Sequence, residues 1–554
     1  MDFQHPFLTQ NIIAYIGNKR SLLGLIHQAI ESTVPNLKPG TRFFDVFAGS
    51  GVVSRLGKYL GCEVYANDWE PYSYIINKGM IETDRGDILA EFGSIDRLEA
   101  MLEEINHLPD PKEDDQYIAK YYAPKSFDIE KADFRTERLF YTRENALTID
   151  KIRNFIEDEY PPGKNDRVRN LLLALLLYEA ATHTNTSGVF KAFHKGFGGH
   201  GRDAMKRILS PVRLQTPSLI DSLYQVHVFQ QDAEELIKKP EVQGVDIAYL
   251  DPPYNQHQYG SNYHMLNTIA LWDKIPAPLE LNEKGVLKEK AAIRKDWKRT
   301  KSDYCYRDTA VSAFSHLLEN IEAKHILISY STDGIIPFEV MRDLCMKKGR
   351  IGIVTNEYTK YRGGKQSNSR VNTNIEFILT IDTGKVSTSP SIEQVESVIN
   401  KKRILLLLKQ KYSPRKLALC AEKIGNDCVE FSLGTRKIAL PGKNGFELKP
   451  VPEINTFTIE ETEAFFHLLS KCVCETKEEE LEAILSILED ESTRDPQYYL
   501  RRVPDTLKKL AHKKNKDRYY TMLKKVKALP GQLYEKIADK IVKVEEIAEK
   551  RFSS

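Results

Sequence analysis

The stretch that decides the fold is RFFDVFAGSG, which runs from Arg42 to Gly51. Its first half, Arg42–Val46, is rich in aromatic and β-branched residues and predicts a buried strand. A Gly-x-Gly turn follows, and Val52–Leu60 then has a helical pattern. A glycine turn between a strand and a helix lets the backbone approach a bound cofactor closely, because no Cβ intervenes. We therefore expect a strand–turn–helix unit with a ligand at its turn.

Further strand-like runs recur on both sides of this unit, with helical stretches between them. Strands that alternate with helices imply a mostly parallel sheet covered on both faces, so the predicted fold class is a doubly wound α/β sheet. In such sheets ligands bind at the carboxyl ends of the strands. The other predicted strands are Glu63–Asn67, Val226–Gln230, Asp246–Leu250, His325–Ser329, Ile351–Thr355 and Ile375–Ile381.

The 554 residues exceed what one core serves, so we expect two or three domains. The α/β domain is predicted from residues 1–83 and 168–384, interrupted by an acidic helical insertion at 84–167, with an α-rich accessory domain at 385–554. A composition of 41% hydrophobic and 29% charged residues predicts a soluble, cytoplasmic protein. The longest apolar run, Leu171–Leu177, is too short to cross a membrane. Seven scattered cysteines favour free thiols.

Asp68 follows the second predicted strand at the distance where an acidic side chain meets ribose hydroxyls in nucleotide-binding units. An N-cap of the next helix would use the same residue type. The third glycine of the dinucleotide fingerprint is missing, since Ser54 stands in its place. A plain tight connection at Gly49–Gly51 therefore stays open beside the cofactor interpretation.

The strongest signal is Asp251-Pro252-Pro253-Tyr254, directly after the strand Asp246–Leu250. The chemistry of this tetrapeptide suits an amine. An adenine amino group, for example, is a poor nucleophile because its lone pair is delocalised into the ring. A carboxylate and a backbone carbonyl that accept its two N–H bonds can draw the nitrogen towards tetrahedral geometry. The prolines aim the carbonyls rigidly, and Tyr254 offers a ring face for an extruded base.

These motifs resemble the alpha-ordered, Dam-like adenine-N6 DNA methyltransferases over about Asn11–Ile381. The resemblance implies an S-adenosylmethionine-dependent, Rossmann-like methyltransferase domain with Asp251, Pro252, Pro253 and Tyr254 as catalytic residues. In this family a lysine such as Lys19 faces the methionine part of the cofactor, and an acid such as Asp232 meets its adenine amino group. The implied cofactor-binding residues are Tyr15, Lys19, Asp45, Phe47, Ala48, Gly49, Ser50, Gly51, Asp68, Asp232 and Asp251.

The motif order is the alpha order, in which the DNA-reading segment lies between the cofactor half and the catalytic half. The resemblance thus makes residues 84–167 a candidate target-recognition segment. Two departures leave target recognition open. The insertion is longer than in the smallest members of the family, and the region after Gly384 is absent from the core pattern.

Local basic stretches supply charge that the net value of +2 hides. Leu281–Lys301 holds eight Lys or Arg against three Asp or Glu, and Tyr358–Lys365 is a second basic and aromatic stretch. Arg501–Lys527 holds eleven against two, downstream of the acidic Glu475–Glu491. Each stretch suits DNA phosphates. Solvated surfaces, or pairing between the two C-terminal stretches, would use the same residues.

Several alternatives share this chemistry. A cytosine-N4 methyltransferase uses the same amine reaction but usually begins the motif with Ser, and a protein-glutamine methyltransferase typically begins it with Asn. A catalytically silent DNA-binding specificity subunit would need neither Asp251 nor Tyr254. We expect double-stranded DNA as the partner, a possible companion restriction endonuclease, and no metal, since His257, His264 and Cys305 lack ligand spacing.

Overall fold

The computed structural model describes residues 1–199, 201–355, 374–490 and 493–553. These residues form two compact units, one of residues 1–355 with Glu376–Thr388 and one from Ser389 onwards. No helix among the described residues is long and apolar enough to cross a membrane.

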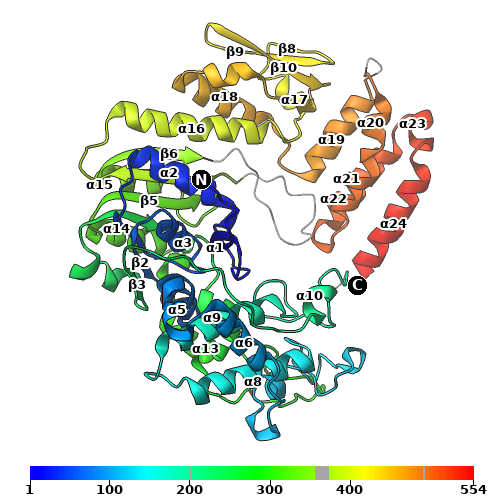
Figure 1. The fold of residues 1–554 in the computed structure, drawn as a ribbon. Helices are drawn as coiled ribbons and strands as arrows, with labels where there is room; N and C mark the ends of the chain where they lie inside the picture. The colour runs from blue at the N-terminus through cyan, green and yellow to red at the C-terminus, as the bar shows by residue number, and fades with distance from the viewer. Residues whose placement is uncertain (200, 356–373, 491–492, 554) are drawn as a thin grey trace. The chain divides into compact units, whose positions relative to one another are not determined.

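The first unit is built on a seven-stranded sheet with the order β3-β2-β1-β4-β5-β7-β6 (Figure 1). The pairs that join β3, β2, β1, β4 and β5 are parallel, whereas β7 runs antiparallel to both β5 and β6. The seven predicted strands are therefore confirmed, with ends that shift by one or two residues. The bounds are β1 Arg42–Asp45, β2 Glu63–Asn67, β3 Val226–Phe229, β4 Val245–Leu250, β5 Ala323–Ser331, β6 Arg350–Thr355 and β7 Glu376–Asp382.

Helices cover both faces of this sheet. Phe43, Ile247 and Ile378 lie in one core cluster with residues of α2 and α3. Side chains alternate along a strand, and the neighbouring Phe377 meets Phe338 of α15 edge-on at 5.3 Å between ring centroids. The doubly wound α/β class is thus confirmed. The helices nearest the sheet are α1 Pro6–Thr9, α2 Leu23–Thr33, α3 Val52–Tyr59, α11 Ala233–Leu236, α14 Ala310–Asn320 and α15 Phe338–Lys348.

A helical body adjoins the sheet. Its centre is α9, Asp166–Thr182, which is apolar nearly all round and packs against α4, α8 and α13. Helices of the predicted insertion share one core cluster with α9 and α13, so residues 84–167 are not a separate globule, and their role in target reading stays a prediction. The other members are α4 Pro71–Asn77, α5 Arg85–Phe92, α6 Ile95–Asn106, α7 Ile118–Tyr121, α8 Arg143–Glu159, α10 Met205–Leu209, α12 Tyr259–Asn262 and α13 His264–Leu271.

The second unit begins with a mixed part and ends with helices. A four-stranded antiparallel sheet of order β11-β10-β9-β8 packs with α16, α17 and α18 around one core. A second core joins α19 to α24. The bounds are α16 Ser389–Leu407, α17 Pro414–Leu417, β8 Lys423–Ile424, β9 Cys428–Leu433, β10 Arg436–Lys443, β11 Glu447–Leu448, α18 Ile459–Cys472, α19 Lys477–Leu488, α20 Pro496–Leu500, α21 Arg502–Leu510, α22 Lys516–Lys527, α23 Gly531–Glu535 and α24 Ala538–Ser553.

Candidate active site

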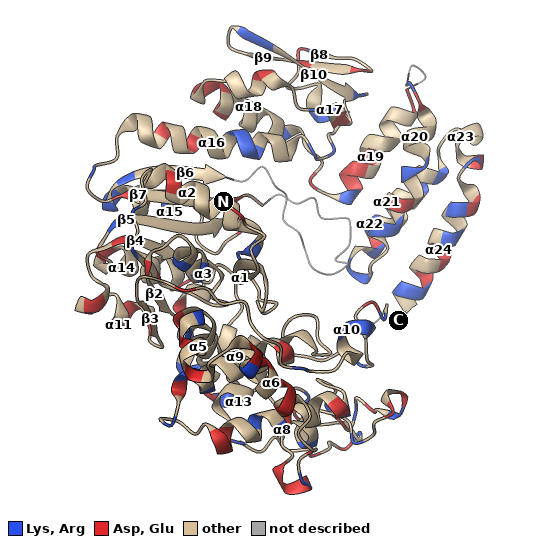
Figure 2. Cartoon of the chain, in the orientation of Figure 1, with Lys and Arg blue, Asp and Glu red and all other residues tan. Residues whose placement is uncertain are grey.

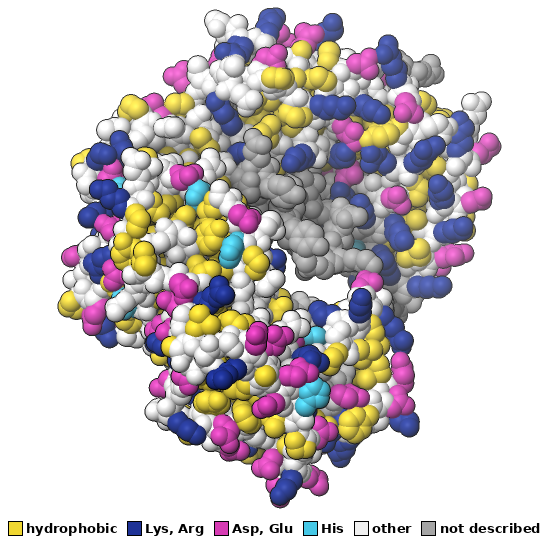
Figure 3. All heavy atoms as spheres, in the orientation of Figure 1, with side chains coloured by type: hydrophobic (Ala, Val, Ile, Leu, Met, Phe, Trp, Pro, Cys, Tyr) yellow, Lys and Arg dark blue, Asp and Glu magenta, His cyan; other side chains and the backbone are white. Residues whose placement is uncertain are grey.

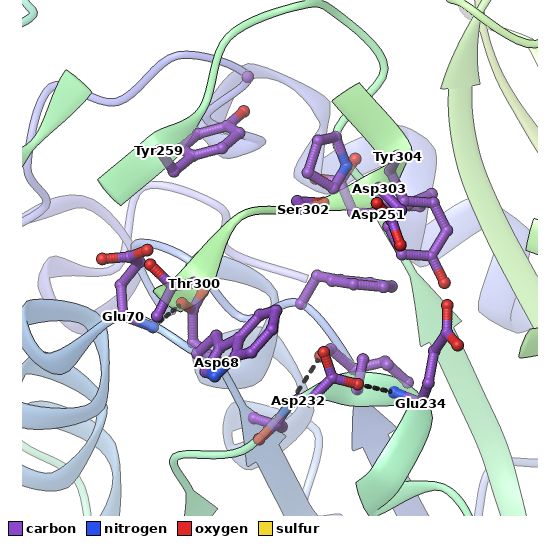
Figure 4. A pocket seen from close by; sticks show the side chains of 18 of the residues that line it. Asp68, Glu70, Asp232, Glu234, Asp251, Tyr259, Thr300, Ser302, Asp303 and Tyr304 are labelled. Atoms are coloured by element: carbon purple, nitrogen blue, oxygen red, sulfur yellow. Dashed lines mark hydrogen bonds between the residues drawn. The ribbon is translucent and has the colours of Figure 1, made fainter. Parts of the chain in front are cut away.

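The strand order reverses between β1 and β4, and doubly wound sheets bind ligands outside the carboxyl ends of the strands at such a point. A cavity of about 190 Å³ lies there. The segments that follow β1, β2, β3 and β4 all contribute to its lining, through Phe47, Asp68, Asp232 and Asp251 respectively (Figure 4). The structure therefore brings together residues that are distant in the sequence and that the motifs singled out.

Asp251 forms a largely buried ion pair. Its Oδ1 lies 2.9 Å from Nζ of Lys19, and the Lys19 side chain is only 5% exposed. The same ammonium lies 5.1 Å from the ring centroid of Tyr254. Lys19 thus contacts the first and last residues of the predicted catalytic tetrapeptide. Its contact in this structure is Asp251, and the predicted contact with a cofactor stays a prediction.

The surroundings of this pair shift both pKa values. Burial raises the pKa of Asp251 to about 6, against the opposing effect of Lys19. For Lys19, burial alone would lower the pKa, but the attractions of Asp251, Tyr254 and Glu376 together outweigh it and the net pKa is raised. Both groups are therefore charged at neutral pH. Asp251 is the one that becomes protonated in mild acid, as the pH falls through about 6.

The glycine loop is shaped by a carboxylate and by positive φ angles. Gly49 and Gly51 have φ of 53° and 77°, and a Cβ on Gly49 would lie 2.9 Å from the ring of Tyr15. The Gly49 N–H donates to Oδ2 of Asp68 at 2.8 Å. Ser73 Oγ donates to the Gly49 carbonyl at 2.6 Å. The loop backbone is thus held in one conformation. A side chain in place of Gly49 would occupy the space that close approach of a cofactor requires.

Asp68 and Asp232 each have a structural duty as well. Oδ1 of Asp68 accepts from the Glu70 N–H at 2.9 Å, and Oδ1 of Asp232 accepts from the Glu234 N–H at 2.8 Å as the N-cap of α11. Both residues also line the cavity. Asp68 is not a helix cap, since the N-cap of α4 is Glu70, whereas Asp232 caps α11. Both structural roles are compatible with a ligand role.

Asp45 differs from the other predicted cofactor residues. It is 1% exposed, and its Oδ2 accepts from Ser54 Oγ at 2.7 Å. It is absent from the lining of the main cavity and from that of a smaller hollow beside Ala48 and Ser50. Burial raises the pKa of Asp45 to about 7. Among the described residues it thus anchors the start of α3 beneath the loop, and a direct cofactor contact stays a prediction.

Comparison with known proteins identifies the family. The model of the D12 class N6 adenine-specific DNA methyltransferases matches residues 15–318. The chain belongs to this class. It is 32% identical over 369 residues to the type II methyltransferase M.NlaIII of Neisseria lactamica, a match that covers 66% of this chain and 96% of that protein.

Two other relatives show how far the similarity extends. M.FokI of Planomicrobium okeanokoites is 30% identical over 376 residues, which is 66% of this chain and 52% of that protein. M.CviAII of Paramecium bursaria Chlorella virus 1 is 29% identical over 355 residues, with 64% and 93% covered. All three are named type II methyltransferases. The family decides for an adenine-N6 DNA methyltransferase over the cytosine, glutamine and silent-subunit alternatives.

The methyltransferase cavity has further walls that the motifs did not indicate. Trp69 and Glu70 follow Asp68, Glu234 follows Asp232, and Tyr304 closes another side. Burial raises the pKa of Glu70 to about 7, and its Oε2 accepts from Asn267 at 2.6 Å. For Trp69, Glu70 and Glu234, the available sequence signal was their proximity to Asp68 and Asp232. Nothing local indicated Tyr304.

An aromatic stack supports the same site. The ring of Tyr15 lies 5.1 Å from that of Tyr259 and 4.9 Å from that of Tyr263, both nearly parallel to it. Tyr263 Oη accepts from the Ile16 N–H at 2.7 Å. The stack therefore joins the N-terminal motif to the segment after the predicted catalytic tetrapeptide, a contact that periodicity alone did not indicate.

The basic segment Leu281–Lys301 of the methyltransferase runs into this cavity wall. Buried Arg138 donates to the carbonyl of Glu289 in this segment, from Nε at 3.2 Å and from Nη2 at 3.0 Å, and Arg294 pairs with Asp273. The last two residues of the segment, Thr300 and Lys301, line the cavity together with Tyr304.

The second basic stretch, Tyr358–Lys365, lies outside the described residues. Among the described residues, no group of three or more His, Cys, Asp or Glu could hold a metal ion.

Proposed function

We propose that the chain transfers the methyl group of S-adenosylmethionine to N6 of an adenine extruded from double-stranded DNA at a specific site. The observation that carries the proposal is that Asp251 lines both hollows of the site. It shares the main cavity with Tyr254 and Asp68, and it shares the smaller hollow with Gly49 of the glycine loop. A donor held by the loop and a base held by the tetrapeptide would meet there.

The residues present fit this cofactor. Gly49 gives a close backbone cradle, and Asp68 and Asp232 offer carboxylates to hydroxyl and amino groups. When bound, the cofactor supplies a methyl group on a positively charged sulfur, and acidic and aromatic walls suit such a cation. Tyr15 and Phe47 would cover its apolar parts.

The chain's own residues would then prepare the amine. Asp251, as a carboxylate, accepts one N6–H bond, and a proline carbonyl accepts the other. The lone pair freed from the ring would take up the methyl group that the cofactor supplies, and one N6 proton would leave to solvent along its hydrogen bond to the Asp251 carboxylate. Lys19 keeps the Asp251 carboxylate oriented and ionised. The ring of Tyr254 supports the extruded base, because only an unstacked base reaches the cavity.

DNA contacts outside the cavity would come from the segment beside it. Lys298, Arg299 and Lys301 are exposed close to the cavity wall, and cations there suit the phosphates that flank an extruded adenine. The relatives' names include modification methylases. We therefore place this enzyme with the DNA in the cytoplasm, as the modification part of a restriction-modification system with a companion endonuclease.

The domain roles follow from the same proposal. Residues 1–83 and 168–384 would form the catalytic domain, and residues 84–167 would contribute to target recognition. The accessory domain 385–554 lies outside the family match, which ends at residue 318.

Asp68→Ala and Asp232→Ala are each expected to weaken binding of S-adenosylmethionine with little effect on DNA binding. A lost hydrogen bond to a charged acceptor costs about 1.5–3 kcal/mol, which corresponds to roughly a tenfold to hundredfold rise in Kd. Asp68→Ala should cost more, since it also releases the Gly49 N–H. Calorimetry measures both affinities. Unchanged cofactor affinity in both variants would mean that the cofactor binds elsewhere.

In the pH profile of kcat/KM, the fall in activity on the acid side is expected near pH 6; we call this fall the acid limb. The pKa of Asp251 is raised to about 6, and only its carboxylate form accepts the amine hydrogen, so activity falls as pH drops through that value. Lys19→Gln removes a charge that lowers this pKa, and the limb should move to higher pH. A limb that stays in place in the Lys19→Gln variant would show that Asp251 does not govern it.

A further inference from the structure

The helical end of the second unit carries a charge pattern that the family match does not cover. Part of the basic stretch Arg501–Lys527 is neutralised within the unit. Its ion pairs are Lys525 with Glu482, Lys527 with Glu545, Arg518 with Glu478 and Arg502 with Glu447. Four of its eleven cations are thus used internally, and the acidic helix α19 takes two of them.

Five of the seven cations that remain lie where α21 meets α22. Lys508, Lys509, Lys513, Lys514 and Lys516 are exposed and form no ion pair among the described residues. We call these five lysines the α21–α22 corner. Figure 2 shows Lys and Arg on both helices, and Figure 3 shows such side chains over the surface of the helices α19–α24.

Buried side chains and hydrogen bonds hold the backbone beneath the α21–α22 corner. Leu507, Leu510 and Tyr519 are buried beneath it. Arg551 near the end of α24 donates to the carbonyls of Lys508 and Ala511 at 3.4 and 3.1 Å. This contact closes the end of α21 and brings a further cation to the corner. The lysines are therefore presented from a fixed backbone.

Fold stability does not explain the position of all five lysines. Lys508 and Lys509 are in the last turn of α21, where cations are favourable. Lys513, Lys514 and Lys516 precede or begin α22, where a cation opposes the helix dipole. Lys513 and Lys514 are adjacent in the sequence and Lys516 follows two residues later, so their like charges also repel each other. A group that costs stability where it lies is expected to serve an anionic partner.

We propose that the α21–α22 corner binds the phosphate backbone of double-stranded DNA, independently of the target sequence. The choice of DNA rests on the proposed function, because the enzyme's substrate is itself a polyanion. Exposed Tyr520, 45% accessible, lies beside the corner and adds a flat polar and apolar face. The corner would then raise DNA affinity without reading bases.

The test compares two triple variants of the full chain on one non-cognate and one cognate duplex. K513Q/K514Q/K516Q removes three charges from the corner. K536Q/K540Q/K543Q removes three exposed charges from the first turns of α24 and the turn before it. Lys540 and Lys543 lie about 12 Å or more from Arg551 along the helix axis. DNA affinity is measured by fluorescence anisotropy over a range of salt concentrations, and Tm is measured for both variants.

The corner variant is expected to flatten the plot of log K against log salt concentration by about 0.9 per lost contact, on both duplexes, with Tm equal to or above that of the wild type. The control variant should keep the wild-type slope. Equal slopes for all three proteins, or an equal loss in both variants, would overturn the proposal. Methyl transfer at saturating DNA is recorded alongside. Its absence in the wild type would refute the proposed function while leaving the binding result valid.

Discussion

Asp251→Ala is expected to abolish methyl transfer while binding of S-adenosylmethionine survives. The carboxylate's proposed partner is the target amine, so its contribution is largest at the transition state. The value of kcat should therefore fall far more than DNA affinity. Single-turnover assays with labelled cofactor measure the loss, and calorimetry measures the affinity that should remain.

Two further variants make this result interpretable. Asp251→Asn keeps the shape of the side chain but removes the charge that faces Lys19 at 2.9 Å, and it should also be nearly inactive. Asp308→Ala removes an exposed carboxylate that lines neither hollow of the site, and it should be fully active. Turnover close to wild type in Asp251→Ala would remove the proposed role of the tetrapeptide.

Tyr254→Ala is expected to lose most of the activity, whereas Tyr254→Phe should keep much of it. The ring face supports the extruded base, and stacking on an aromatic ring is worth roughly 1–3 kcal/mol per base. The structure holds this ring by an edge contact with Tyr330 at 5.6 Å and by the ammonium of Lys19, and phenylalanine preserves both contacts.

A fluorescent adenine analogue at the target position reports the extruded state directly. Its fluorescence should rise with the wild type and with Tyr254→Phe, and stay low with Tyr254→Ala. Equal losses in the two variants would assign the role to the hydroxyl group instead of the ring.

Strand positions in the first unit could be predicted because short buried runs and the residues after them are local features. The antiparallel direction of β7 could not, since direction depends on which neighbour a strand finds. The hairpin of β9 and β10 was also missed, although Val429, Phe431 and Leu433 alternate with polar residues before Gly434. Lys/Glu-rich surroundings pointed to helices there and outweighed the alternation.

The site was predictable to the extent that it follows strand ends. Asp68 and Asp251 could be chosen because carboxyl ends of parallel strands meet at one edge, whereas Asp232 was chosen from the family resemblance. The Lys19–Asp251 pair joins residues 232 positions apart in the sequence, and no local pattern indicates it. The burial of Asp45 under the loop likewise depends on packing that a motif does not contain.

The most direct test of the account is the identity of the methylated base. The purified chain is incubated with labelled S-adenosylmethionine and double-stranded DNA, the DNA is digested to nucleosides, and these are separated by chromatography. The label is expected only in N6-methyl-2′-deoxyadenosine, and it should disappear with Asp251→Ala. Label in N4-methylcytosine, or in the protein with none in the DNA, would contradict the account.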